Sequence, residues 1–177
     1  MQHTSSTPSL RLRAMEPEDL EALYQIENDM QLWQVGATNV PYSRFALHEY
    51  MTSVTNDIYT DKQLRLMVEN DGGELVGMAD LVNFDPRHLR AEVGIVIRKL
   101  YRRRGYATAT LERLITYAQT VLHLHQLYAV VASDNLPAVG LFRKSGFRQS
   151  GELADWLAQG GGNYVSAIVM QYFLQKS

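Results

Sequence analysis

The feature that most constrains the fold is an amphipathic helical stripe set between two short apolar segments. Residues 105–122 place small and apolar side chains on one face at helical spacing: Ala107, Leu111, Leu114, Ile115, Ala118 and Val121. The flanking segments, 89–97 and 126–132, have the length and composition of strands. A strand, a helix and a strand in this order form a crossover, so the two strands are predicted to be parallel or nearly so.

The rest of the chain predicts further elements around this crossover. Acidic residues beside a proline are typical of a helix start, and Asn70-Asp71-Gly72-Gly73 is typical of a hairpin turn. We expect an α/β (α+β) fold: a mixed, mostly antiparallel sheet of about six or seven strands, with a central parallel pair and helices on both faces. The remaining predicted elements are helices from about 16 to 28, over 45–54 and over 135–146, and strands over 64–68, 74–85, 148–157 and 164–174.

Length and composition predict a single domain. The chain has 177 residues and a mass of 20.1 kDa, with 46% hydrophobic and 20% charged residues, which is enough for one compact core. We expect residues 1–9 to form a flexible polar tail and residues 10–177 to form the domain. The absence of cysteine excludes disulfides, a thiolate nucleophile and cysteine-ligated zinc.

Net charge and hydropathy indicate which partners and which cellular location to expect. A formal net charge of -2 gives no general reason to expect nucleic acid or an anionic membrane as a partner. No stretch reaches the roughly 18 consecutive apolar residues of a membrane helix, and the polar N-terminus is unlike a secretory signal. We therefore expect a cytoplasmic protein.

The turn that enters the central helix is strongly basic. Residues 98–104 contain five basic side chains in seven, and Gly105 follows at the predicted helix start. Unpaired N–H groups at a helix N-terminus and the helix dipole favour a phosphate or pyrophosphate there. An ordinary solvated basic loop and a nucleic-acid patch are the alternatives. The glycine patterns of Walker and dinucleotide-binding loops are absent from the sequence.

Two motifs carry a family resemblance. Arg102-Arg103-Arg104-Gly105-Tyr106-Ala107 resembles the Arg/Gln-x-x-Gly-x-Gly/Ala signature of the GNAT superfamily of N-acetyltransferases, in the same place between a strand and a helix. About thirty residues later, the segment from Asn135 to Phe147 resembles the second motif of that family. The resemblance covers nearly the whole chain, and it is closest to the branch of spermidine acetyltransferases and ribosomal-protein N-terminal acetylases.

The resemblance implies acetyl-CoA as the cofactor and names residues that would bind it. Backbone N–H groups of the basic turn would hold the pyrophosphate, the strand at 95–97 would pair with the pantetheine arm, and an extended amide-bearing arm suits an exposed strand edge. Asn135 would contact the pantetheine, and Lys144 would reach a phosphate. The predicted cofactor-binding residues are Ile95, Val96, Ile97, Arg102, Arg103, Arg104, Gly105, Tyr106, Ala107, Thr108, Asn135, Phe142 and Lys144.

The chemistry predicted from the resemblance is direct acetyl transfer to a primary amine in a ternary complex. Such a reaction needs a neutral amine, a donor for the oxyanion and a proton for the thiolate. A strand N–H near Ile97 is a candidate oxyanion donor, and Glu92 is the candidate catalytic base. Phe142 stands where the spermidine branch has its proton-donating tyrosine, and phenylalanine cannot donate. Another tyrosine (Tyr101, Tyr106, Tyr128 or Tyr164) or water would replace it, or the thiolate would leave unassisted, with its charge eased by the helix N-terminus at Asn135.

The acceptor site is predicted between the first two helices, their connecting loop and the last hairpin. Trp33, Tyr42 and Trp156 are its candidate substrate-binding residues. The paired acids that polyamine acetylators tend to have before the loop's Pro-Tyr are replaced by Asn39 and Val40. A small or polyamine-like amine is the first hypothesis, a peptide N-terminus the second, and a CoA-binding sensor the third. A homo-oligomer is compatible with the sequence, and histidine spacing predicts no metal site.

Overall fold

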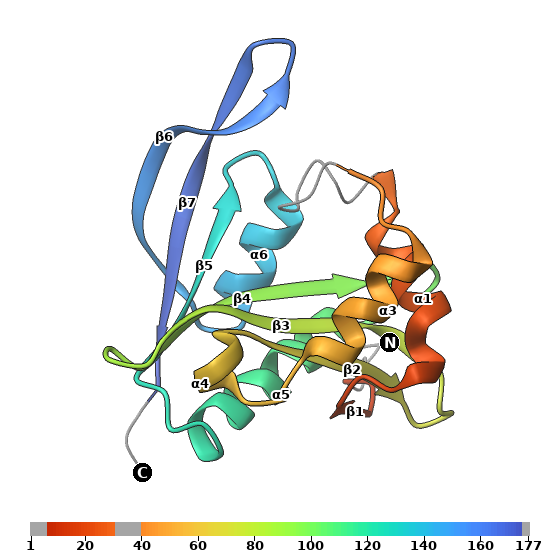
Figure 1. Ribbon diagram of the computed structural model, residues 1–177. Helices are drawn as coiled ribbons and strands as arrows, with labels where there is room; N and C mark the ends of the chain where they lie inside the picture. The colour runs from red at the N-terminus through yellow and green to blue at the C-terminus, as the bar shows by residue number, and fades with distance from the viewer. Residues whose placement is uncertain (1–6, 31–39, 175–177) are drawn as a thin grey trace, which may run out of the picture.

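A computed structural model describes residues 7–30 and 40–174, and it contains one seven-stranded mixed sheet (Figure 1). The strand order across the sheet is β1-β2-β3-β4-β5-β7-β6. β4 and β5 are parallel, and the other neighbouring strands among the described residues are antiparallel, which confirms the predicted fold class. The strands are β1 (Leu10–Arg13), β2 (Leu64–Asn70), β3 (Leu75–Asp85), β4 (Arg90–Ile97), β5 (Gln126–Ala132), β6 (Arg148–Gly160) and β7 (Asn163–Phe173).

Helices cover both faces of the sheet and enclose two hydrophobic cores. The larger core lies beneath α5 and α6, and the smaller one lies beneath α1 and α3. No helix among residues 7–30 and 40–174 is long and apolar enough to cross a membrane. The helices are α1 (Leu20–Glu27), α3 (Arg44–Ser53), α4 (Ile58–Asp61), α5 (Tyr106–Thr120) and α6 (Leu136–Lys144), with 3-10 turns η1 (Pro17–Asp19) and η2 (Lys99–Tyr101).

The two faces of β4 contribute to different cores. Ala91 and Val93 are buried in the core beneath α5, whereas Val96 packs against the core beneath α1. Side chains alternate along a strand, so Glu92 and Gly94 lie on the α1 side with Val96. The candidate base and the first two helices therefore share one face of the sheet.

The central parallel pair separates soon after it forms. β4 and β5 are in register only over residues 90–92 and 126–128, although β4 continues to Ile97 and β5 to Ala132. β3 stays paired with β4 as far as Ile97, and β7 stays paired with β5 as far as Ala132. Beyond Glu92 and Tyr128, the facing edges of β4 and β5 are therefore open.

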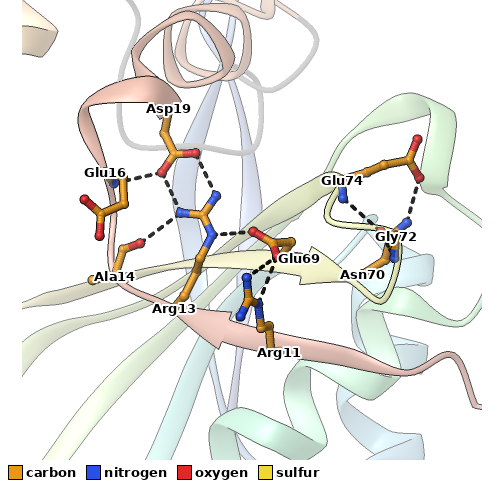
Figure 2. Close-up of polar contacts among 9 residues, drawn as sticks. All are labelled: Arg11, Arg13, Ala14, Glu16, Asp19, Glu69, Asn70, Gly72 and Glu74. Atoms are coloured by element: carbon orange, nitrogen blue, oxygen red, sulfur yellow. Dashed lines mark hydrogen bonds and ion pairs between the residues drawn. The ribbon is translucent and has the colours of Figure 1, made fainter.

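An ionic network fastens the first strand and the first helix to the sheet (Figure 2). The Arg13 guanidinium donates to both carboxylate oxygens of Asp19, at 2.7 and 2.9 Å, and to Glu69 of β2 at 2.6 Å. Arg11 binds the same Glu69 carboxylate. Burial acts to raise the pKa of Asp19, but hydrogen bonds from Arg13 and the backbone N–H of Glu16 outweigh it, and the net shift is downward.

The last two strands form a long hairpin that projects beyond the rest of the sheet (Figure 1). Its register shifts three times, including between Leu153 and Leu157, where Asp155 has a positive φ of 48°. A hydrogen bond of 2.7 Å from Gln159 to Asp134 joins the far part of the hairpin to the segment before α6. The predicted closing strands are confirmed, and β6 extends three residues beyond its predicted end at residue 157.

Candidate active site

The site is built on the open edge of β4. Where a strand continues without a neighbour, its backbone N–H and C=O groups are available to an extended ligand. The segment 95–97 lies on this stretch, with Ile95 and Val96 half-buried and Ile97 buried. The side chain of Arg102 returns to the strand and donates to the Ile97 carbonyl at 2.9 Å. The side chains of residues 95–97 thus support the cores while their backbone borders the opening.

The basic turn after β4 has the backbone shape of an anion-binding loop. Arg103 and Gly105 have positive φ values of 60° and 84°, and α5 begins immediately afterwards at Tyr106. Left-handed residues next to a helix start direct successive N–H groups into one concavity, which favours anions. The first-turn N–H groups of α5 belong to Tyr106, Ala107 and Thr108, and they have no partner within the helix.

The aromatic residues of this loop hold its shape. The rings of Tyr101 and Tyr106 meet edge to face at 6.0 Å, and the Arg104 guanidinium lies 5.9 Å from the Tyr101 ring centroid. The side chains of Arg102, Arg103 and Arg104 are exposed to solvent. The loop therefore combines an ordered backbone with three solvent-facing cations.

Asn135 begins α6, which follows β5 directly. Its side-chain oxygen accepts from the Ala138 N–H at 3.2 Å, an N-cap that leaves the two amide N–H groups for another partner. Further along α6, Phe142 is 6% exposed and packs against Phe147 with ring centroids 5.0 Å apart. Lys144 ends the helix and is exposed. The position expected to hold a proton donor is thus an aromatic core residue.

Glu92 is the last residue of β4 paired with β5, and its partner in register is Tyr128. The Glu92 carboxylate accepts a 2.8 Å hydrogen bond from the side-chain amide of Asn83, which is on β3. Burial raises the pKa of Tyr128, the nearby Glu92 charge raises it further, and Arg90 and a hydrogen bond with Asn83 act in the opposite direction. The side chains of Asn83, Glu92 and Tyr128 lie at the point where β4 and β5 separate. The sequence alone did not indicate Asn83, because one asparagine in a strand carries no distinctive pattern.

A pocket of about 100 Å³ lies between α1 and the end of β4. Gln25 and Asp29 line it from the α1 side, and Arg98 donates to Gln25 across it at 3.4 Å. Its other lining residues are Ile26, Val96, Ile97, Lys99 and Arg102. The predicted cofactor strand and basic turn therefore border one concavity with the first helix.

The two predicted acceptor residues that the structure describes lie on different elements. Tyr42 precedes α3 and is exposed, and its backbone is held by Asn28, which accepts from the Tyr42 N–H at 2.8 Å and donates to its carbonyl at 3.0 Å. Trp156 is 59% exposed on β6. Trp33 lies outside the described residues. Asn28, which ties α1 to the start of α3, is a positioning residue that the sequence did not indicate.

Known proteins are similar to this chain in sequence and in fold. The family model described as an acetyltransferase (GNAT) domain matches residues 9–148. The spermidine N(1)-acetyltransferase of Escherichia coli K12 is 34% identical over 171 residues, covering 95% of this chain and 88% of that protein. A crystal structure of the Vibrio cholerae spermidine N-acetyltransferase in complex with CoA and spermine matches with a TM-score of 0.85 and 28% identity, covering 94% of this chain and 96% of that one.

A putative ribosomal N-acetyltransferase of Bacillus subtilis is 30% identical over 159 residues and covers 86% of this chain. With the family model matching most of the sequence, this chain belongs to the GNAT family of acetyltransferases. It is an acetyl-CoA-dependent N-acetyltransferase that transfers an acetyl group to a primary amine. The open edge of β4 and the shape of the basic turn suit the two polar parts of that cofactor, its amide-bearing arm and its diphosphate.

Proposed function

We propose that this enzyme acetylates a primary amino group of a small polyamine. The observation that carries the proposal is the separation of β4 from β5 beside an anion-binding turn, in a chain whose relatives include spermidine acetyltransferases. A related structure contains both CoA and spermine. The cofactor would lie along the open edge of β4, and the amine would approach from the face that carries α1 and α3.

The cofactor-binding roles are assigned residue by residue. The backbone of residues 95–97 would pair with the pantetheine arm, and the N–H groups of residues 102–108 would hold the pyrophosphate. The free amide N–H groups of Asn135 would bind the arm near the start of α6, and Lys144 would contact a phosphate. Phe142 would contribute apolar contact only, because it has no polar atom and is buried against Phe147.

The catalytic role belongs to Glu92. When bound, acetyl-CoA supplies an activated acetyl group, so the acceptor nitrogen gains a C–N bond as the C–S bond breaks. The acceptor ammonium loses two protons in all: Glu92 accepts one before attack, directly or through water, and the other leaves with the thiol. A backbone N–H near Ile97 would stabilise the oxyanion. Trp33, Tyr42 and Trp156 would border the acceptor.

An acceptor with positive charge suits the α1-facing side of the sheet. Arg65 is held there between Asp80, at 2.8 and 2.9 Å, and Glu27, so two carboxylates share one guanidinium. Burial opposes the charged form of Arg65, but hydrogen bonding and charge from Asp80, with the charge of Glu27, produce a net upward shift of its pKa. Asp80 and Glu27 thus place two carboxylates on the α1-facing side of the sheet, which favours a cationic acceptor there.

The second candidate is a protein N-terminal acetyltransferase. It is favoured by the similarity to the putative ribosomal enzyme and by a 32% identity over 75 residues with an N-alpha-acetyltransferase of Sulfurisphaera tokodaii. The third candidate, a CoA-binding sensor that does not catalyse acetyl transfer, is supported only by the absence of a proton donor at Phe142. The relatives named as acetyltransferases favour an enzyme. We also propose a cytoplasmic location. We further propose that several copies of the chain assemble, because a related spermidine acetyltransferase is dodecameric.

Free-thiol release from acetyl-CoA, measured across an acceptor panel, tests this proposal. The panel contains spermidine, spermine, monoamines and peptides with free N-termini, and calorimetry measures CoA binding separately. We expect the polyamines to give the highest kcat/KM. Turnover with peptides alone would establish the N-terminal acetyltransferase instead. CoA binding with no thiol release on any acceptor would overturn the proposed acceptor class.

A further inference from the structure

Asn83 occupies an unusual backbone position close to the catalytic site. Its φ is +51°, in the left-handed region that asparagine tolerates better than most residues. The register of β3 with β4 shifts there: Val82 pairs with Glu92 and Asp85 with Arg90, so two residues of β3 face one residue of β4. This is a β-bulge, a feature that redirects a side chain and is frequent beside active sites.

The redirected side chain reaches the pair of residues at which the strands separate. Its amide donates to Glu92 at 2.8 Å, and Tyr128 is the partner of Glu92 in the β4–β5 register. The three residues come from three neighbouring strands. Arg90 and Asp85 are the other charged groups close to them, and they neutralise each other in an ion pair of 3.1 Å.

We propose that Asn83 is a positioning residue for acetyl transfer, holding the Glu92 carboxylate where the acceptor amine meets the open edge of β4. This inference rests on the proposed function, in which Glu92 accepts a proton from the acceptor ammonium. One Glu92 oxygen is fixed by the amide, so the other is directed to the ammonium or its bridging water. The proton then passes to solvent, and Asn83 itself gains and loses none.

A glycine substitution removes the amide while keeping the backbone. Asn83→Gly tolerates the positive φ, and Asn56→Gly is the matched control, because Asn56 is also an exposed asparagine with a φ of +58°. We expect Asn83→Gly to lower kcat about tenfold, the size of one hydrogen bond to a charged group, with unchanged CoA affinity and thermal midpoint. We expect Asn56→Gly to retain wild-type kcat.

Asn83→Asp tests the role through the pH dependence of kcat/KM, which would not change if Asn83 only supported the fold. A carboxylate beside Glu92 should shift the acidic limb of the kcat/KM profile upward by roughly one pH unit. An inactive Glu92→Gln variant would support Glu92 as the base. If Asn83→Gly then keeps wild-type kcat and Asn83→Asp leaves the pH profile unshifted, the positioning role of Asn83 is wrong while the proposed base is retained. If Glu92→Gln retains full activity, the proposed base is wrong and the inference falls with it.

Discussion

Gly105 is the residue on which the proposed anion-binding turn most directly depends. Its φ of +84° disfavours any other side chain, and a Cβ there would lie 3.0 Å from Cδ of Pro8. We expect Gly105→Asp to weaken CoA binding at least about tenfold, because it adds strain, bulk and a negative charge where a diphosphate would bind. Isothermal titration with CoA measures the effect.

A matched variant separates the anion site from general backbone strain. Gly73 also has a positive φ, +76°, and a Cβ there would meet no atom within 4 Å in the turn between β2 and β3. Gly73→Asp should therefore carry the same charge and a similar strain while leaving CoA affinity unchanged. Equal affinities for the wild type and Gly105→Asp would contradict the placement of the diphosphate at this turn.

At the scale of elements, the joint between η1, β1 and β2 depends on Asp19. The folded-state pKa of Asp19 is lowered, so its carboxylate stabilises the fold above its ordinary pKa of 3.8, and this contribution disappears as pH falls through the folded-state value. Asp19→Asn should cost about 2 kcal/mol at neutral pH, since two charge-assisted bonds to Arg13 are lost.

Urea unfolding of the wild type and Asp19→Asn from pH 7 down to pH 3 tests this assignment. The difference in the free energy of unfolding should be largest near neutrality and should narrow below pH 3.8. Asp71→Asn, in the exposed turn after β2, removes the same charge and should leave stability nearly unchanged. If the difference between the wild type and Asp19→Asn is constant with pH, the ion pair is not its cause.

Elements were predictable where a local pattern was long. The helical stripe of α5 and the apolar strands beside it indicated the β4–α5–β5 crossover correctly, and the glycine-rich turns indicated the β2–β3 and β6–β7 hairpins. The four-residue helix α4 was not predicted, because Ile58–Asp61 is too short for periodicity to be recognised. The bulge at Asn83 was not predicted either, since a register shift depends on the neighbouring strand.

At the scale of the whole molecule, the projecting hairpin leaves apolar surface uncovered. Trp156 and Tyr164 are each 59% exposed on β6 and β7. Exposed aromatic side chains on a projecting element are typical of an interface, and a related acetyltransferase assembles as a dodecamer. We expect light scattering after size exclusion to give the mass of an assembly of at least two 20.1 kDa chains. A single 20.1 kDa species at micromolar concentration would contradict this expectation.

The sequence by itself determined the class of fold, the cofactor and the place of the basic turn before α5, because each depends on residues close together in the chain. Periodicity, a glycine at a helix start and a run of arginines are local signals. Only the tertiary structure decided where β4 and β5 separate, that Phe142 is buried against Phe147, and that Asn83 reaches Glu92. Those facts join segments from different strands and helices, and their contacts depend on register and packing that no local pattern encodes.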